Sequence, residues 1–216
     1  MLKFFLLSFT LFLIFLSNTF SCENNSYIEN RIEIWKSYYV NTQPTDTARN
    51  WYLPFETSNR LNPKTMSVVS TFGSPRNSYV KGHIHTGLDC IPKSSGENVD
   101  IYSMSDGIVC SIHLAHPYIT IVVKHKTISG EIIFTSYKHL AEVYVKTGDN
   151  VNHKTKLARL YTRKETKKYG GRYDHLHLEI RKDFGDYGPA SWATMTKEEL
   201  NCRFYDPLIF IRENVR

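Results

Sequence analysis

The segment Tyr-Asp-His-Leu-His-Leu-Glu-Ile at residues 173–180 constrains the fold more than any other part of the chain. In an extended strand, successive side chains point to opposite faces of the sheet. The strand then has an apolar face, formed by Leu176, Leu178 and Ile180, and a polar face, formed by His175, His177 and Glu179. The apolar face requires a hydrophobic core. The two histidines, with Cα atoms roughly 7 Å apart, are close enough for one imidazole to bind a metal ion while the other acts beside it. A half-buried strand that carries histidines without a site fits this segment about as well.

A second motif, His85-Thr-Gly-Leu-Asp89, places an imidazole and a carboxylate four residues apart. On a straight strand their Cα atoms would lie roughly 13 Å apart. On a helix they would be neighbours, but Gly87 disfavours a helix interior. A bend or bulge at Gly87 would bring them together. With His177 they form a set of two imidazoles and one carboxylate, which suits catalytic zinc with one coordination position left for water.

These two motifs, with Ser-Tyr-Lys-His-Leu at residues 136–140 between them, resemble the LytM/lysostaphin-like zinc endopeptidases that cut peptidoglycan peptides. The resemblance extends from about Val68 to Ile211. Further matching segments lie at residues 70–73, 106–109, 145–151 and 206–208. Single His-x-His and His-x-x-x-Asp motifs are common by chance, but three motifs in this order with glycine-containing turns between them give a strong signal.

The resemblance implies a mostly β fold, a compact antiparallel β sandwich of the duplicated-hybrid-motif type with its groove on one sheet. It implies one Zn²⁺ per chain on His85, Asp89 and His177, with His139 and His175 as the catalytic histidines. Those two imidazoles would share the proton transfers and the stabilisation of the oxyanion in peptide hydrolysis.

The chain departs from the family pattern near the expected site. His-Pro-Tyr-Ile-Thr at residues 116–120 replaces the usual Gly-Asn turn, and the approach to the His-Leu-His motif, residues 164–172, is strongly basic. Asp174 stands where relatives usually carry a small residue, and on an alternating strand it faces away from the site. Tyr79, six residues before His85, is a candidate for contact with the oxyanion or the substrate, as a tyrosine is in some relatives. These differences concern substrate specificity rather than the metal ligands.

From residue 68 onward, the alternation of β-prone runs and turn residues predicts short strands. Runs of β-prone residues lie at 99–104, 107–113, 118–125, 131–138, 156–161 and 175–181, separated by turns rich in Gly, Ser and Asp. Residues 182–205 form an insertion, in which Thr196 and Glu199 are spaced as a capping box for a short helix. We expect this insertion to form one wall of the groove. His83 could compete with His85 as a ligand, but only His85 has Gly and Asp at the matching offsets, so His83 is interpreted as an exposed neighbour. The histidines at 113, 116, 125 and 153 are interpreted as surface or structural residues.

The N-terminus has the pattern of a secretory signal. Lys3 precedes an apolar run at residues 4–16 and small residues follow, and the run is shorter than the ~20 residues of a transmembrane helix. We predict cleavage after Ser21 and a secreted, periplasmic or cell-envelope location. Cys22 would then be the first residue, so a lipid anchor is an alternative, although Thr19 stands where the bacterial lipobox usually has Leu.

The predicted organisation is a signal peptide at 1–21, an N-terminal helical and extended segment at 22–64 and a zinc peptidase domain at 65–216. Residues 26–40 are expected to be helical, with an apolar stripe of Ile28, Ile32, Trp35 and Tyr39. We expect the N-terminal segment to pack against the peptidase domain, and a propeptide-like cover over the site is the alternative.

The charge and the cysteine content limit the kinds of binding partner and metal site that the chain can have. The formal net charge is +6, and without the signal peptide it falls to +5 because only Lys3 is lost. This charge fits an anionic cell-wall surface, and there is no basic run interleaved with aromatics that would indicate nucleic acid. The four cysteines form no Cys-x-x-Cys motif, so a cysteine zinc site is not expected, while Cys90 and Cys110 are candidates for a disulfide in an oxidising compartment. We expect a monomer with a peptidoglycan peptide as its substrate.

Two other functions fit the chain less well. A non-catalytic relative would bind the cell wall or activate a partner hydrolase, but such members usually lose metal ligands, whereas all five expected positions are filled here. A metal-binding structural protein on an unrelated fold would not account for the order of the motifs and turns.

Overall fold

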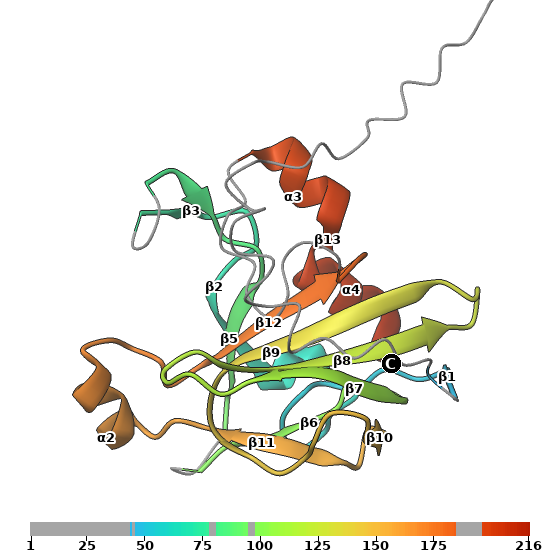
Figure 1. Cartoon of the computed structure of the whole chain (residues 1–216), viewed down its shortest axis with the longest axis horizontal. Helices are drawn as coiled ribbons and strands as arrows, with labels where there is room; N and C mark the ends of the chain where they lie inside the picture. The colour runs from blue at the N-terminus through green and yellow to red at the C-terminus, as the bar shows by residue number, and fades with distance from the viewer. Residues whose placement is uncertain (1–43, 45, 78–80, 95–97, 185–195) are drawn as a thin grey trace, which may run out of the picture.

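The structure is a computed structural model, and it describes residues 44, 46–77, 81–94, 98–184 and 196–216. The prediction of a mostly β fold is confirmed, because one large sheet dominates the molecule and all its strand pairings except one are antiparallel (Figure 1). The signal peptide, the expected helix at 26–40, Cys22 and Tyr79 lie outside the described residues.

The central sheet is built from seven strands in a continuous order. From one edge to the other they are β10 (Asn150–Val151), β7 (Gly107–His113), β8 (Ile119–Thr127), β9 (Ile132–Val143), β12 (Leu176–Arg181), β5 (Leu88–Pro92) and β2 (Met66–Ser70). The 12-residue strand β9 pairs with β8, β12 and β11, and so connects the central sheet to a second group of strands.

Shorter elements surround this sheet. The remaining strands are β11 (Lys156–Leu160) and β6 (Asp100–Tyr102), which pair with each other, β13 (Phe204–Tyr205) on β12, β1 (Thr47–Ala48) parallel to β8, and the separate β3 (Pro75–Arg76) and β4 (His83–Ile84) ribbon. The helices are η1 (Pro63–Thr65), α2 (Arg163–Thr166), η2 (Lys167–Tyr169), α3 (Lys197–Arg203) and α4 (Pro207–Asn214). No helix in the described part of the chain combines the length and the apolar character needed to cross a membrane.

The two faces predicted for the segment at 175–181 are present. Leu176, Leu178 and Ile180 are fully buried in the main hydrophobic core. Leu53 and Phe55 of the preceding segment are fully buried in that same core. The described part of the N-terminal segment therefore packs with the strands, and the predicted domain boundary at residue 65 stays a prediction.

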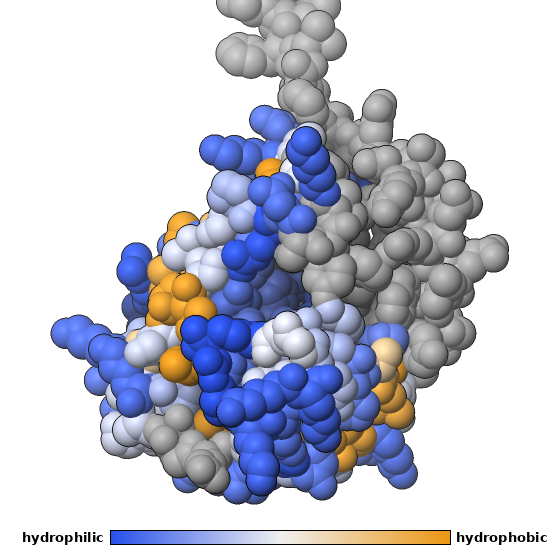
Figure 2. All heavy atoms as spheres, turned by 90° about the vertical axis from the view of Figure 1, so that its left-hand side faces the viewer, coloured by the Kyte–Doolittle hydropathy of each residue, from blue (hydrophilic) through white to orange (hydrophobic). Residues whose placement is uncertain are grey.

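The described part of the insertion packs beside the β3–β4 ribbon. Thr196 is the N-cap of α3, and its side chain accepts a hydrogen bond from the Glu199 N–H, so the predicted helix start is confirmed. Leu200 and Phe204 form a small apolar cluster with Phe72 and Ile84. Residues 185–195 lie outside the described part, and the role of the insertion as a groove wall stays a prediction. The face that carries β3 and α2 is mostly hydrophilic, with hydrophobic residues in small separate areas (Figure 2).

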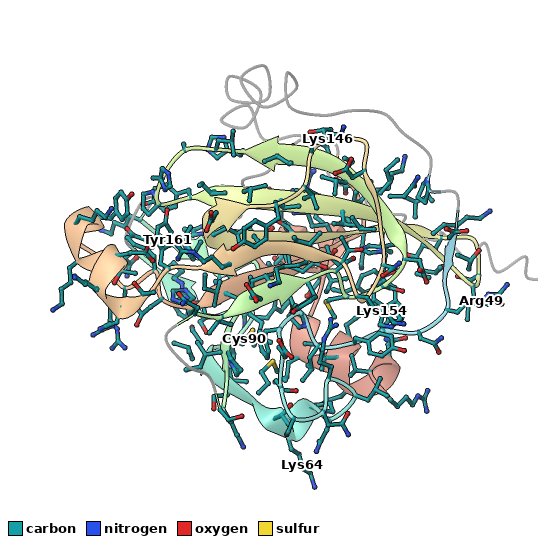
Figure 3. The ribbon with its side chains drawn as sticks, turned by 90° about the horizontal axis from the view of Figure 1, so that it is seen from below. Arg49, Lys64, Cys90, Lys146, Lys154 and Tyr161 are labelled. Carbon is teal, nitrogen blue, oxygen red and sulfur yellow. The ribbon has the colours of Figure 1, made fainter. Side chains whose placement is uncertain are left out.

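The suggested disulfide between Cys90 and Cys110 is wrong. Both side chains are buried and free (Cys90 is labelled in Figure 3). Cys90 lies on β5 and Cys110 on β7, with β8, β9 and β12 between them in the sheet. Four strand spacings amount to roughly 19 Å, whereas a disulfide needs Cα atoms within about 7 Å.

Candidate metal centre

The register between β5 and β12 brings two predicted ligands together. Asp89 lies directly opposite His177, and Leu88 lies directly opposite Leu178. Directly opposite residues of a strand pair point to the same face of the sheet. The leucine pair therefore enters the core while the Asp89 and His177 side chains meet on the other face.

Gly87 allows the third predicted ligand to reach them. Residues 85–87 lie between β4 and β5 and are not part of either strand. The expectation that His83 is exposed is wrong, because its side chain is buried on β4. A Cβ atom on Gly87 would lie 2.5 Å from the Leu178 carbonyl oxygen and 2.9 Å from the His177 ring. Glycine is needed here because the chain approaches β12 closely, and this approach places His85 beside His177.

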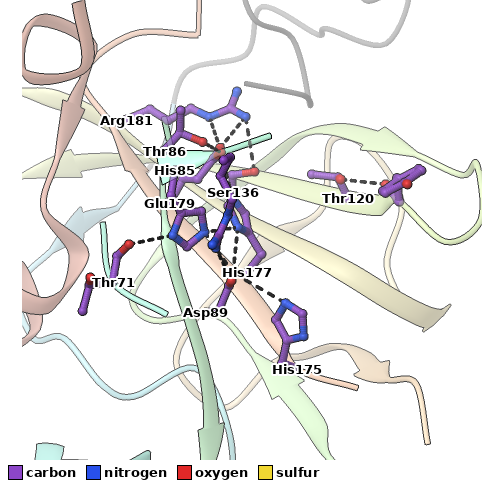
Figure 4. A network of polar contacts seen from close by, with 12 residues as sticks. Thr71, His85, Thr86, Asp89, Thr120, Ser136, His175, His177, Glu179 and Arg181 are labelled. Atoms are coloured by element: carbon purple, nitrogen blue, oxygen red, sulfur yellow. Dashed lines mark hydrogen bonds and ion pairs between the residues drawn. The ribbon is translucent and has the colours of Figure 1, made fainter. Parts of the chain in front are cut away.

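Three donor atoms of these side chains form a nearly equilateral triangle. His85 Nε2, Asp89 Oδ1 and His177 Nδ1 lie 3.0 Å from one another, and all three residues are buried (Figure 4). Ligand atoms bound to tetrahedral zinc at about 2.0–2.1 Å would be separated by roughly 3.3–3.4 Å. The triangle is therefore close to one face of a tetrahedral zinc site.

The outer nitrogens of both imidazoles are held by acceptors. His85 Nδ1 donates to the Thr71 carbonyl oxygen at 2.7 Å, and His177 Nε2 donates to Glu179 Oε1 at 2.9 Å. In neutral imidazoles this leaves a lone pair on His85 Nε2 and on His177 Nδ1. Two nitrogen lone pairs and a carboxylate oxygen thus point toward one another, and none of these three acceptors carries a hydrogen to donate. A metal cation bound between them would satisfy all three.

The charges around the triangle favour a cation. Burial would raise the pKa of Asp89, but contacts with the imidazoles of His175, His177 and His85 hold it well below its ordinary value. Burial lowers the pKa of His177, yet Asp89 and Glu179 on its two sides raise it above its ordinary value. A proton would therefore be drawn to this cluster, and a bound metal ion would replace it.

His139 reaches the site through a β-bulge. Thr120 lies opposite Lys138 and Ile119 lies opposite Leu140, so His139 is an extra residue in β9. Its φ of +68° is in the left-handed region, where a residue other than glycine is strained. Leu140 is again fully buried in the core. Strict alternation would have turned His139 toward the core.

The two predicted catalytic histidines lie beside each other and beside the triangle. The ring centroids of His139 and His175 are 5.0 Å apart, and His175 Nε2 lies 3.5 Å from Asp89 Oδ1. His139 Nδ1 donates to the Pro117 carbonyl oxygen at 3.1 Å, which leaves Nε2 as an acceptor. Burial, with the neighbouring imidazoles of His175 and His177, holds the pKa of His139 well below its ordinary value, so this ring is neutral at pH 7.

Comparison with known proteins identifies the family of the chain. Residues 83–189 match the model of peptidase family M23. The chain belongs to peptidase family M23. The M23 match contains all five predicted ligand and catalytic positions, whose roles remain predictions for this chain.

Similar solved structures include peptidases and a chain from a protein complex. Lysostaphin from Staphylococcus simulans, an antimicrobial peptidase, has 17% identity and a TM-score of 0.50 over 78% of this chain and 56% of its own. A chain of the SpoIIIAH–SpoIIQ complex has 21% identity and a TM-score of 0.46 over 74% of this chain and 99% of its own. A zinc-containing peptidase from Vibrio cholerae has 26% identity and a TM-score of 0.42 over 62% of this chain and 37% of its own. The lysostaphin likeness supports the fold, and this chain spans just over half of that protein. A comparison with curated protein sequences gave no match.

Sequence reasoning gave no role to three residues that hold the ligands. Thr71 accepts from His85, and Arg76 donates to Asp89 Oδ2 at 2.7 Å, so only Oδ1 of that carboxylate faces the triangle. Both precede the M23 match. Thr71 lies in the segment 70–73 that resembles the family, and this was its available signal, whereas no pattern indicated Arg76. Glu179 lies within the match, on the histidine face of the strand, and this position was the available signal.

Glu179 belongs to a fully buried ion pair. It accepts from Thr86 Oγ1 at 2.6 Å and from Arg181 Nε at 2.8 Å, and neither charged side chain is exposed. Burial would raise the pKa of Glu179, but the charges of Arg181 and Lys138 hold it well below its ordinary value. Glu179 is therefore a carboxylate that keeps the proton of His177 on Nε2 and leaves Nδ1 for a metal.

Proposed function

We propose that this M23 peptidase is a zinc-dependent endopeptidase that hydrolyses peptide bonds in peptidoglycan stems or cross-bridges. The observation that supports this best is the 3.0 Å triangle of His85 Nε2, Asp89 Oδ1 and His177 Nδ1. Two further imidazoles lie next to it and are not needed to hold an ion. A purely structural metal site would instead be closed by a fourth protein ligand.

The residues around the triangle have distinct tasks in this proposal. A Zn²⁺ ion on His85, Asp89 and His177 would lower the pKa of a bound water toward about 7 and polarise a peptide carbonyl. His139 accepts the proton of the nucleophile, since its ring is neutral and its Nε2 carries a lone pair. His175 donates a hydrogen bond to the oxyanion. The proton that His139 has accepted then passes to the leaving amine.

The test compares four single variants in zinc content, thermal melting and release of fragments from purified peptidoglycan. His139→Ala and His175→Ala should keep zinc and fold but lose activity by ~10²–10⁴-fold. His177→Ala should lose both zinc and activity. His153→Ala is the matched control, because the His153 imidazole takes no part in the triangle and stacks on Tyr52, with ring centroids 4.1 Å apart. This variant should keep both zinc and activity.

Two outcomes would change the proposal. Loss of zinc in His175→Ala with retention in His177→Ala would exchange the roles of the two histidines. Full activity in both the His139 and His175 variants would contradict the mechanism. A wild-type protein that holds zinc but releases no fragments from any peptidoglycan would favour the non-catalytic, wall-binding alternative.

We also propose that the protein acts outside the cytoplasm, with mature material beginning at or near Cys22. Mass spectrometry of protein isolated from the native cell tests this directly. An N-terminal Met on protein in the cytosolic fraction would contradict secretion. Diacylglycerol on Cys22 would select the lipoprotein form over simple secretion.

A further inference from the structure

The two segments that depart from the family pattern meet at one place in the structure. His116 stacks on Tyr169, with ring centroids 5.8 Å apart and planes 6° apart, and its Nδ1 hydrogen-bonds the Tyr161 hydroxyl. The Tyr118 and Tyr173 hydroxyl oxygens lie 3.3 Å apart. Residues 116–118 and 161–173 thus form a single aromatic wall, named here the tyrosine wall.

The tyrosine wall reaches the catalytic pair. The ring centroid of His139 lies 5.1 Å from that of Tyr173 and 5.9 Å from that of Tyr118. Both tyrosines are half-buried, so each keeps part of its surface open to solvent. A Cβ atom on Gly171 would lie 2.5 Å from the Tyr173 ring, so this glycine lets the ring pack flat against the backbone.

The acidic groups in and directly after the wall are already paired. Arg163 donates to both oxygens of Asp174 at 3.0 and 3.2 Å, which ties α2 to the residue before His175. Arg159 donates to both oxygens of Glu165 at 2.8 and 2.9 Å. Glu165 also completes a capping box at the start of α2.

The remaining cations of the segment are exposed. Four side chains on and after α2 have no ion-pair partner in the described part of the chain, namely Lys164, Lys167, Lys168 and Arg172. The helix α2, which contains Lys164, lies on a mostly hydrophilic face of the molecule (Figure 2). An excess of positive charge therefore adjoins the aromatic rings beside the catalytic histidines.

We propose that the tyrosine wall and these four cations form a subsite for a carboxylate-bearing segment of the substrate peptide. This inference rests on the proposed function and adds the chemical class of peptide that the site selects. The aromatic faces pack against the peptide, and the Tyr118 and Tyr173 hydroxyls offer hydrogen bonds. The cations attract carboxylates, whose charge the peptide loses when these groups are amidated. The subsite controls affinity for the peptide, whereas His139 and His175 control the chemistry.

The test uses two full-chain variants with the same loss of charge. K164Q/K167Q/K168Q removes three cations of the subsite, and K64Q/K146Q/K154Q removes three exposed cations elsewhere, at positions seen in Figure 3. Each is made in the zinc-loaded His175→Ala background, so that peptide binding is measured without turnover. The probes are a soluble stem peptide with free carboxylates and the same peptide with those groups amidated, and melting temperatures verify that both variants fold.

The expected result is a roughly tenfold rise in the Kd of the free-acid peptide in the subsite variant, the combined effect of a few exposed ion pairs. The control variant should change it by less than about twofold, since screening limits distant charges. The amidated peptide should bind the His175→Ala protein about as weakly as the free acid binds the subsite variant. Equal losses in both variants, equal affinity for both peptides, or no binding of the free-acid peptide would each overturn the subsite.

Hydrolysis measured on chains with His175 intact separates this inference from the proposed function. If neither peptide is cut while the subsite variant still binds the free acid tenfold more weakly, the subsite stands and the endopeptidase proposal fails. If both peptides are cut with the same KM, the endopeptidase proposal stands and the subsite fails.

Discussion

The two carboxylate oxygens of Asp89 lie within 3.0 Å of His85, His177 and Arg76, and His175 Nε2 is 3.5 Å from Oδ1. Asp89 supplies the only negative charge in the triangle, so it would offset the charge of a bound metal ion more than either imidazole would. We predict that Asp89→Ala loses most of its zinc, because a three-ligand site rarely keeps the ion with two neutral ligands. Elemental analysis of purified protein measures this. Asp174→Ala removes a nearby carboxylate that pairs with Arg163 instead, and it should keep its zinc. Stoichiometric zinc in Asp89→Ala would show that the ligand assignment is wrong.

His139 allows backbone strain to be separated from chemistry. Its φ of +68° is strained for alanine and unstrained for glycine. We therefore predict that His139→Gly is more stable than His139→Ala by about 1 kcal/mol, although glycine normally destabilises a strand. Both variants should be equally inactive. Urea unfolding of the two proteins measures the difference, and a less stable glycine variant would argue against the bulge.

Single residues show what the sequence pattern contains and what it omits. Alternation along the strand placed His177 on the face opposite the leucines, and the spacing of His85 and Asp89 required a bend at Gly87. The side of the sheet reached by His139 did not follow from alternation, because one inserted residue reverses the order of the faces. Arg76 contacts Asp89 from a separate ribbon, and such a contact between distant segments leaves no local pattern.

At the scale of elements, the crossing of the segment 85–87 over β12 depends on Gly87. We predict that Gly87→Ala weakens zinc binding and destabilises the fold by about 1–3 kcal/mol, the range for overpacking a close contact. The added Cβ would be 2.5 Å from the Leu178 carbonyl oxygen, and that backbone is fixed by the sheet. Zinc titration and thermal melting measure the two effects.

Gly148→Ala is a suitable control for this substitution. Gly148 has a φ of +95°, and a Cβ atom there would have no other atom within 4 Å, so alanine adds backbone strain without a clash. It should lower stability by about 1 kcal/mol and leave zinc affinity unchanged. Equal zinc affinity in Gly87→Ala and Gly148→Ala would refute the role of the close approach.

The elements that the sequence predicted least well lie around the site. The strands at 107–113 and 156–160 match their expected ranges closely. Strand β9 runs to Val143, beyond the expected end at 138, because the bulge lets it continue from one strand partner to the next. The basic segment overlaps α2, which the sequence analysis did not predict. The start of this helix has a sequence signal, because Thr162 and Glu165 form a capping box.

At the scale of the whole molecule, the chain's turns and motifs indicated the mostly β fold but not how its first described segment packs. Trp51, Leu53 and Phe55 enter the core, and Trp51 bridges to Val215 near the other end of the chain. An apolar segment without periodicity indicates that its residues are buried in a core, but it does not show which residues they pack against. Long-range contacts of this kind depend on the assembled sheet.

The stability of the whole molecule should depend on pH through His125, which is not one of the proposed metal ligands. This ring is fully buried, packs on Trp51 and donates from Nδ1 to the Asp106 carbonyl oxygen at 2.7 Å. Its Nε2 lies 2.8 Å from Thr135 Oγ1. Burial lowers the pKa of His125 from 6.5 to about 4, and the hydrogen bond to Asp106 opposes this only in part.

The sign of the effect follows from proton binding in the two states. Between pH 6.5 and about 4 the unfolded chain binds a proton at His125 and the folded chain does not. The free energy of unfolding should therefore fall as the pH is lowered through this window, by up to about 3 kcal/mol for a shift of this size. His125→Gln removes the titrating group, so its stability deficit relative to wild type should be largest near pH 7 and shrink toward pH 4. Urea unfolding of both proteins at each pH, in the same metal state, cancels the titration of the metal ligands. A deficit that stays constant between pH 7 and pH 4.5 would show that His125 does not carry this pH dependence.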